Sequence, residues 1–162
     1  MNETVREYVR LTQELDARDT PVVLVLFGDH KPWMGNGGSA YEEMGIDFDT
    51  STLAGFRNYY ATPYLIWANR AAKEVLGADF TGDGGDFSPC FLMTRLFDAC
   101  GWAGPGYMQL SRAMRDISPL LHTNGLFLHD GVLTSVLSDT DRSFYRSWLA
   151  VQYYREHVAA YS

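Results

Sequence analysis

The sequence predicts an α/β fold in which a central, mostly parallel sheet is flanked by helices and followed by a C-terminal hairpin. The first observation is Val22–Phe27, an unbroken apolar run typical of a strand buried on both faces. The second is a similar run at Pro63–Asn69, which begins with proline, a residue tolerated at the first position of a strand. The third is that segments with helical periodicity surround both runs, as expected for helices packed on a sheet.

Capping residues and periodicity predict five helices and one hairpin. Ser88 followed by Pro89 indicates an N-cap with proline at the first helical position, and Gly101 is suited to end that helix. A hairpin is expected over Gly125–Val136, with Asp130–Gly131 as its turn. The predicted helices are residues 2–17, 50–58, 88–100, 107–117 and 139–158, and the stretches MGNGGSAYEEMG and GADFTGDGGDF are predicted as loops.

Length and composition indicate one globular domain, residues 1–162. The hydrophobic share of 46% and the charged share of 20% are ordinary for such a domain. A net charge of −7 without a basic stripe argues against nucleic acid as a partner. No apolar run approaches the roughly 20 residues of a membrane helix, and the N-terminal residues lack the features of a signal peptide. We therefore expect this chain to be soluble.

The two cysteines are not expected to form a disulfide. Cys90 and Cys100 lie ten residues apart in one predicted helix. A helix rises about 1.5 Å per residue, which separates the two by about 15 Å, too far for a disulfide. The cysteine count does not settle the redox compartment.

The most informative residues follow the first predicted strand. Asp29 and His30 come directly after Val22–Phe27 and Gly28. Ligands of open α/β sheets bind beyond the carboxyl ends of the strands. Because neighbouring side chains of a straight strand point to opposite faces, Asp29 and His30 can hold one ion only if the chain bends at Gly28. An Asp/His pair suits Zn²⁺ or Mn²⁺.

A structural role for the same residues is the alternative. Asp29 would then brace the following turn, with His30 on the surface. Two side chains are also too few for a catalytic ion, which takes three or more protein ligands and an open position.

Four blocks of sequence occur in order: VVLVLFGDHKP, YYATPYLIWANR, SPCFLMTRLFDACGW and YMQLSRAMRDISPLLHTNGLFLHDG. Together they resemble the C-terminal part of lipoteichoic acid synthase-like proteins, phosphoglycerol transferases of the sulfatase/alkaline phosphatase superfamily. The resemblance extends from about Val5 to the closing helix. The FGDHKP and TPYLIWAN blocks are quite specific in combination, and the helical blocks are weaker.

The resemblance implies a partial alkaline phosphatase-like sandwich with Asp29 and His30 as metal ligands. The ion would be a divalent metal, with Mn²⁺ favoured over Mg²⁺ or Zn²⁺. The substrate would be a phosphoglycerol or sulfate ester, for which Lys31 and Trp33 are the substrate-binding candidates. A solvated surface role for Lys31, and a role for Trp33 in covering its loop, are the simpler interpretations.

The family's threonine nucleophile and acidic ligand precede the Asp-His pair and have no counterpart in this chain. We therefore expect no catalytic residue here, and a C-terminal fragment that is inactive alone. Its partner would be the N-terminal part of the same catalytic domain. The parent protein would be membrane-anchored, with an extracellular catalytic domain acting in cell-envelope polymer synthesis. A truncated sheet exposes an edge and an apolar face, from which we expect the fragment to self-associate.

Two other functions stay open at this point. One is a non-catalytic module that binds a polyanionic or glycan ligand through Lys31, Trp33 and nearby tyrosines. The other is a self-contained small metal hydrolase that draws further ligands from Asp47, Asp49 or His122.

Overall fold

The computed structural model describes residues 3–32, 35–36 and 39–158. It shows a mixed α/β chain that is mostly helical and contains two small antiparallel sheets within these residues. The strands are β1 (Val23–Phe27), β2 (Tyr64–Ala68), β3 (Phe127–His129) and β4 (Val132–Thr134). The helices are α1 (Glu3–Asp16), α2 (Ser39–Glu43), α3 (Leu53–Tyr60), α4 (Arg70–Leu76), α5 (Leu92–Ala99), α6 (Gly106–Ile117) and α7 (Asp139–His157), with a short 3-10 turn, η2 (Pro89–Phe91), before α5.

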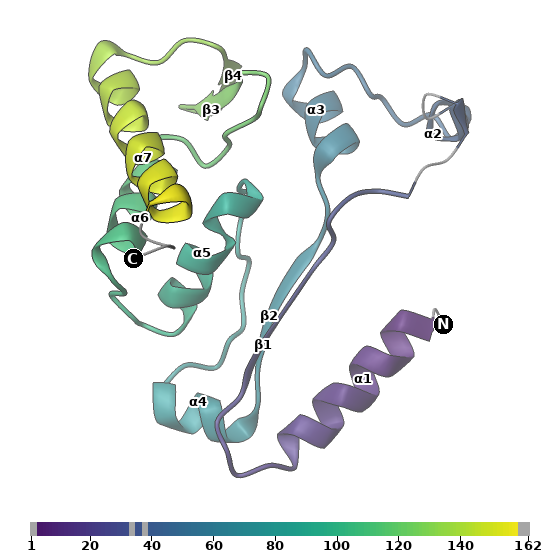
Figure 1. Cartoon of the computed structure of the whole chain (residues 1–162). Helices are drawn as coiled ribbons and strands as arrows, with labels where there is room; N and C mark the ends of the chain where they lie inside the picture. The colour runs from purple at the N-terminus through teal and green to yellow at the C-terminus, as the bar shows by residue number, and fades with distance from the viewer. Residues whose placement is uncertain (1–2, 33–34, 37–38, 159–162) are drawn as a thin grey trace.

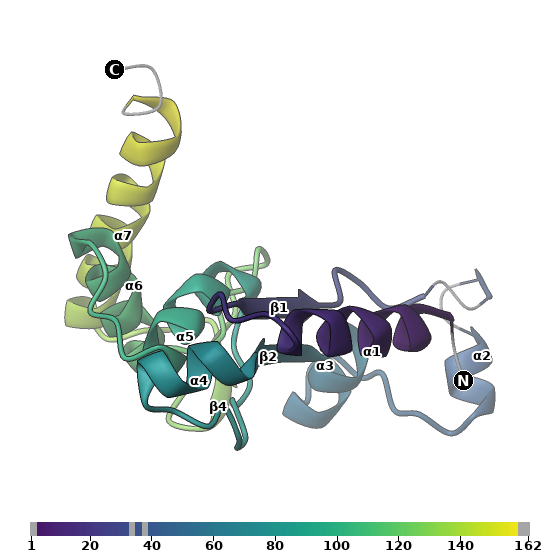
Figure 2. The same ribbon diagram turned by 90° about the horizontal axis from the view of Figure 1, so that it is seen from below.

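Strands β1 and β2 form a two-stranded ribbon with helices around it. Helix α1 runs alongside the ribbon, α3 and α4 lie at its two ends, and α5, α6 and α7 gather with the β3–β4 hairpin to one side (Figure 1). Seen from below, the C-terminal half of α7 projects away from the ribbon (Figure 2). No helix in the described part of the chain is both long enough and apolar enough to cross a membrane.

The predicted strands form, but their surroundings differ from the prediction. β1 and β2 run antiparallel, with Leu26 opposite Leu65, and no parallel pairing is seen among the described residues. The expectation of a β1 buried on both faces is wrong for this chain, because Leu26 is 43% and Phe27 56% exposed. A ribbon of two strands has too few neighbours to cover both of its faces.

Asn69 lies between the end of β2 and the start of α4, and it joins the ribbon to the helices at that end. Its side chain is fully buried and accepts hydrogen bonds from the amide of Val22 and from the amide of Ala72, both at 2.9 Å. The second of these bonds caps the N-terminus of α4. The side-chain nitrogen of Asn69, Nδ2, donates to the carbonyl oxygens of Leu15 and Thr20. These bonds connect the end of α1 to the start of β1.

The main core lies between the C-terminal helices. Phe91, Met114 and Trp148 are buried against one another and come from η2, α6 and α7. The indole N–H of Trp148 donates to the hydroxyl of Ser111 at 3.0 Å, so its one polar group is satisfied within the core. This core fixes the relative positions of η2, α6 and α7.

Most predicted helix limits hold within a few residues, and two short helices were not predicted. Helix α2 lies inside the glycine-rich stretch that was predicted as a loop, and α4 begins at Arg70, just after a predicted strand. The hairpin turn is as predicted, with Asp130 and Gly131 both at positive φ. Cys90 and Cys100 are free thiols, as expected.

Candidate functional site

Asp29 and His30 lie together at the carboxyl end of β1. The strand's pairing ends at Gly28, whose amide donates to the carbonyl of Pro63 at 3.0 Å. A Cβ at Gly28 would lie only 3.0 Å from Cβ of Thr62, so glycine permits this close approach. The chain bends at the next two residues, and Oδ2 of Asp29 lies 3.6 Å from Nε2 of His30.

Both side chains of the pair face solvent, since His30 is 78% and Asp29 80% exposed. The other carboxylate oxygen of Asp29 accepts the amide of His30 at 2.8 Å, and Nδ1 of His30 lies 3.0 Å from the carbonyl of Lys31. This contact leaves Nε2 as the imidazole nitrogen beside the carboxylate. The two groups can therefore offer one oxygen and one nitrogen to a cation from the same side of the bend.

The pair has no third ligand nearby in the part of the chain that the structure describes. There, no group of three or more His, Cys, Asp or Glu side chains is placed to hold a metal ion. Asp47 and Asp49 instead accept backbone amides of their own turn. His122 lies against the rings of Phe56 and Tyr60.

Lys31 is half-buried and points toward α3. Its amine donates to the carbonyl of Asn58 and lies 5.9 Å from the centre of the Phe48 ring. These contacts give Lys31 a structural role in holding the segment after β1 against α3. Trp33, the other substrate-binding candidate, lies outside the described residues.

Aromatic rings form a continuous row beside Lys31. Phe48 contacts Tyr41 and Tyr59, with ring centroids 5.0 and 5.4 Å apart, and Tyr59 contacts Tyr60 at 4.7 Å. Tyr59 and Tyr60 are 44% and 41% exposed. The row therefore presents aromatic residues to solvent, and Lys31 links it to the segment that bears Asp29 and His30.

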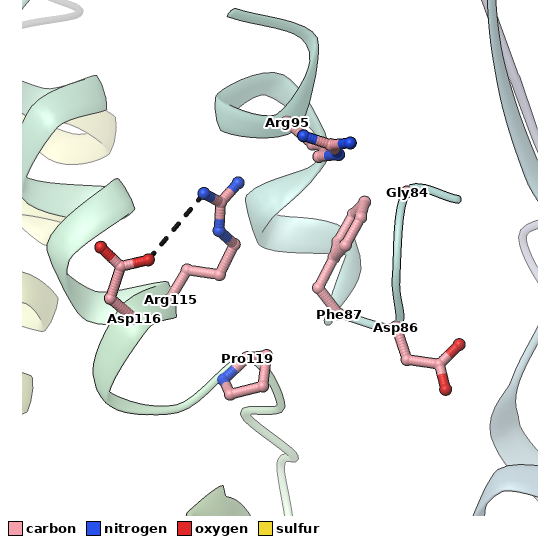
Figure 3. A pocket seen from close by; sticks show the side chains of 7 residues that line it. All are labelled: Gly84, Asp86, Phe87, Arg95, Arg115, Asp116 and Pro119. Atoms are coloured by element: carbon pink, nitrogen blue, oxygen red, sulfur yellow. Dashed lines mark ion pairs between the residues drawn. The ribbon is translucent and has the colours of Figure 1, made fainter. Parts of the chain in front are cut away.

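A separate cavity of about 290 Å³ lies between α5, the C-terminal end of α6 and the loop before η2. Arg95 of α5 and Arg115 of α6 line it, with Phe87 and Pro119 as apolar walls (Figure 3). The guanidinium of Arg115 points toward α5, whereas the carboxylate of Asp86 points away from it (Figure 3). Asp86 is paired instead with Arg57, whose Nε lies 3.0 Å from its carboxylate.

Neither arginine belongs to a sequence motif that indicates a binding site. Helical spacing was the available signal, because Arg95 follows the buried Phe91 by four residues and Arg115 follows the buried Ser111 by four. Residues four apart share a helix face, so both arginines belong to faces that turn toward the interior. Periodicity cannot show that two such faces from different helices border one cavity.

Comparison of the chain with protein-family models found no match, and neither did comparison with curated proteins or with solved structures.

Proposed function

We propose that this chain is the C-terminal portion of a metal-dependent phosphoglycerol transferase or sulfatase-like hydrolase, inactive without the portion that carries the nucleophile. The observation that supports the proposal most is the geometry of Asp29 and His30. A bend after Gly28 brings a carboxylate oxygen and an imidazole nitrogen within 3.6 Å of each other at the end of a strand. Solvent-exposed side chains held in this way suit a cation whose other ligands come from another segment.

The exposed apolar residues of the β1–β2 ribbon support the proposal that a further segment of a larger domain covers it. Leu26 and Leu65 are paired across the strands, and each is more than 40% exposed. Helix α1 contains no buried residue. Apolar side chains directly opposite one another on a sheet face are normally covered. In the proposed whole domain, preceding strands pair with the free edge of β1 and complete a mostly parallel, alkaline phosphatase-like sheet.

In this proposal Asp29 supplies negative charge and a hard oxygen, and His30 a neutral nitrogen that must be deprotonated to bind. A divalent ion, Mn²⁺ first among the candidates, would lower the pKa of a coordinated hydroxyl and neutralise charge on the phosphoryl oxygens. Lys31 helps to position Asp29 and His30, because its amine bonds to the carbonyl of Asn58 and so holds the segment after β1 against α3. The substrate is a phosphoglycerol or sulfate ester of the cell envelope.

Paramagnetic broadening by Mn²⁺ tests the metal half-site on the chain as it is. We expect Mn²⁺ to broaden the NMR signals of Asp29 and His30 first, with Asp29→Asn and His30→Gln each removing the effect. Asp19→Asn and His157→Gln are matched controls, because both side chains are exposed and neither belongs to the segment that follows β1. Broadening centred on Asp47, Asp49 or His122 instead would favour a self-contained hydrolase and contradict the proposal.

Activity tests the rest of the proposal in the full product of the natural reading frame. A continuous frame that adds a threonine-bearing segment should yield Mn²⁺-dependent cleavage of a phosphoglycerol donor. Asp29→Asn should lower kcat by at least about a thousandfold, since a metal ligand is lost, whereas Asp19→Asn should not. A natural product limited to these residues, or an activity indifferent to Asp29, would refute it.

The aromatic row supports one alternative, a non-catalytic module for glycans. Exposed Tyr59 and Tyr60 offer rings on which a sugar can stack and hydroxyls to which it can hydrogen-bond. Binding of an oligosaccharide that survives a chelator and Asp29→Ala, but is lost in Tyr59→Ala, would favour this function over the first.

A further inference from the structure

The cavity between α5 and α6 is lined by two arginines, and the charge of one of them, Arg95, is not neutralised within the part of the chain that the structure describes. Among the described residues, no carboxylate lies within ion-pair distance of Arg95. Nε of Arg95 and Nη1 of Arg115 are both buried, and no other described residue forms a hydrogen bond with either nitrogen. Buried polar groups are almost always paired, since leaving one unpaired is costly, and more so when it is charged. The described residues therefore supply no acceptor for these two nitrogens, which leaves them available to a bound anion.

The nearby acidic residues do not supply that acceptor. Asp98 binds Nη2 of Arg115 at 2.7 Å and Nε of Arg112 at 2.6 Å, so it holds Arg115 from one side only. Asp116 lies 4.0 Å from the same Nη2 and is 70% exposed. Both contacts leave Nη1 of Arg115 unpaired, and Asp86 is engaged by Arg57.

The walls of the cavity are firmly held. Ser88 follows Phe87, and its hydroxyl donates to the carbonyl of Leu121 at 3.0 Å and accepts the amide of Leu121 at 2.8 Å. The amide of Ser88 also donates to the carbonyl of Pro119 at 2.8 Å. These bonds join the loop that bears Phe87 to the segment that bears Pro119. The walls of the cavity are therefore held in place before any ligand enters, which limits the entropic cost of binding.

We propose that this cavity binds a tetrahedral oxyanion, a phosphate or sulfate group, between Arg95 and Arg115. The two guanidinium groups come from different helices, and a tetrahedral anion offers three or more oxygens in different directions. A carboxylate has only two oxygens in one plane, which a single arginine satisfies. The volume of about 290 Å³ is at the lower limit for small-molecule sites, so the ligand is a small ester or the head group of a lipid.

The site is independent of the proposed metal site, since it shares no residue with Asp29 or His30. Titration with inorganic phosphate at constant ionic strength should shift the Nε–H signals of Arg95 and Arg115 in a saturable way. Arg95→Gln should weaken phosphate binding at least tenfold, because it removes a charge that no carboxylate holds in place. Arg146→Gln removes the same charge from an exposed residue of α7 and should leave the affinity unchanged.

Further binding measurements identify the class of ligand and the source of its phosphate group. Sulfate should compete with phosphate, and acetate should not. Glycerol phosphate in solution is compared with vesicles of phosphatidic acid in phosphatidylcholine, and preferential binding of either supports the site and assigns the source. Equal affinity of folded wild-type and Arg95→Gln protein for phosphate would overturn the proposal, as would acetate binding as tightly as phosphate. Asp29→Asn should leave phosphate binding intact, which separates this test from that of the metal site.

Discussion

Asn69 and Val22 are joined by two hydrogen bonds, one through the side chain and one through the backbone. The amide of Val22 donates to Oδ1 of Asn69 at 2.9 Å, and the amide of Asn69 donates to the carbonyl of Val22 at 3.0 Å. This pair closes the end of the β1–β2 ribbon where α1 and α4 meet it. Because the Asn69 side chain is fully buried and its amide group donates to three carbonyl oxygens, no other side chain satisfies the same set of partners.

We therefore expect Asn69→Asp to lower the free energy of unfolding by at least about 3 kcal/mol at neutral pH. The change keeps the shape but sets a buried carboxylate against three carbonyl oxygens. Urea denaturation measures the effect, with exposed Asn124→Asp as a control that should stay within about 0.5 kcal/mol of wild type. A loss at Asn69 no larger than at Asn124 would show that this junction does not contribute to stability.

Asp98 gives a second prediction, because it holds both Arg112 and Arg115. Burial alone would raise the pKa of Asp98, but hydrogen bonds from Arg115 and Arg112 and their charges lower it below 3.8. The group therefore contributes stability above pH 3.8, and this is lost as the pH falls through the lower folded-state pKa. Asp98→Asn should cost roughly 1.5–3 kcal/mol at pH 7.

The measurement for Asp98 is the free energy of unfolding between pH 2 and pH 7. The difference between wild type and Asp98→Asn should shrink on acidification, since protonation removes the same charge from the wild type. Asp116→Asn is the control, because its carboxylate is 70% exposed and only 4.0 Å from Arg115. Exposed pairs of this kind contribute little, so a large effect at Asp116 would contradict the assignment.

His129 gives a prediction of opposite sign. Its Nδ1 hydrogen-bonds the carbonyl of Ile117 at 3.0 Å, which raises the pKa of the imidazole above 6.5; partial burial lowers the pKa, and the charges of Asp130 and Asp141 raise it. The stabilisation is fully present below pH 6.5 and is lost as the pH rises through the folded-state pKa. The stability advantage of wild type over His129→Gln should therefore shrink on the alkaline side of pH 6.5.

An NMR titration of the His129 ring, with denaturation of both proteins from pH 6 to 9, checks this expectation. The other three histidines are common to wild type and variant, so their titration cancels in the difference. A His129 pKa at or below 6.5 would show that the contact with Ile117 does not favour the charged imidazole.

Local signals predicted the elements better than their assembly. Ser88–Pro89 and Asp130–Gly131 set a helix start and a turn through backbone preferences that act within a few residues. The direction in which β2 pairs with β1 depends on contacts between residues some forty positions apart, and no local preference specifies it. The apolar run of β1 correctly indicated a strand, but its burial depends on neighbours that the described residues do not provide.

The candidate sites likewise differ in whether they depend on local sequence or on contacts between distant segments. Gly28 predicted a bend, and Asp29 and His30 do lie together at that bend. The cavity of Arg95 and Arg115 could not be predicted, because it depends on the packing of two helices around Phe91 and Met114. Helix-face periodicity showed at most that each arginine turns inward.

Gly84 lines the arginine cavity and provides a direct test of how the loop is held there. A Cβ at Gly84 would lie 1.5 Å from the hydroxyl oxygen of Tyr64 and 2.5 Å from its Cζ. The Tyr64 ring packs against Phe87, with centroids 4.8 Å apart, so it cannot retreat without disturbing the cavity wall. Because the φ of Gly84 is not positive, Gly84→Ala introduces this collision without backbone strain. We expect a cost of about 1–3 kcal/mol and weaker phosphate binding.

Two variants isolate the collision from other effects of removing a glycine. Gly106→Ala is the matched control, since no atom of the described residues lies within 4 Å of a Cβ at this position, which begins α6. It should be neutral or stabilising by up to about 1 kcal/mol. Tyr64→Phe removes a buried hydroxyl for which the described residues offer no partner, so alone it should cost little. Combined with Gly84→Ala it should restore part of the lost stability, because the nearest atom is gone. Strictly additive costs in the double variant would show that Tyr64 is not what Gly84 accommodates.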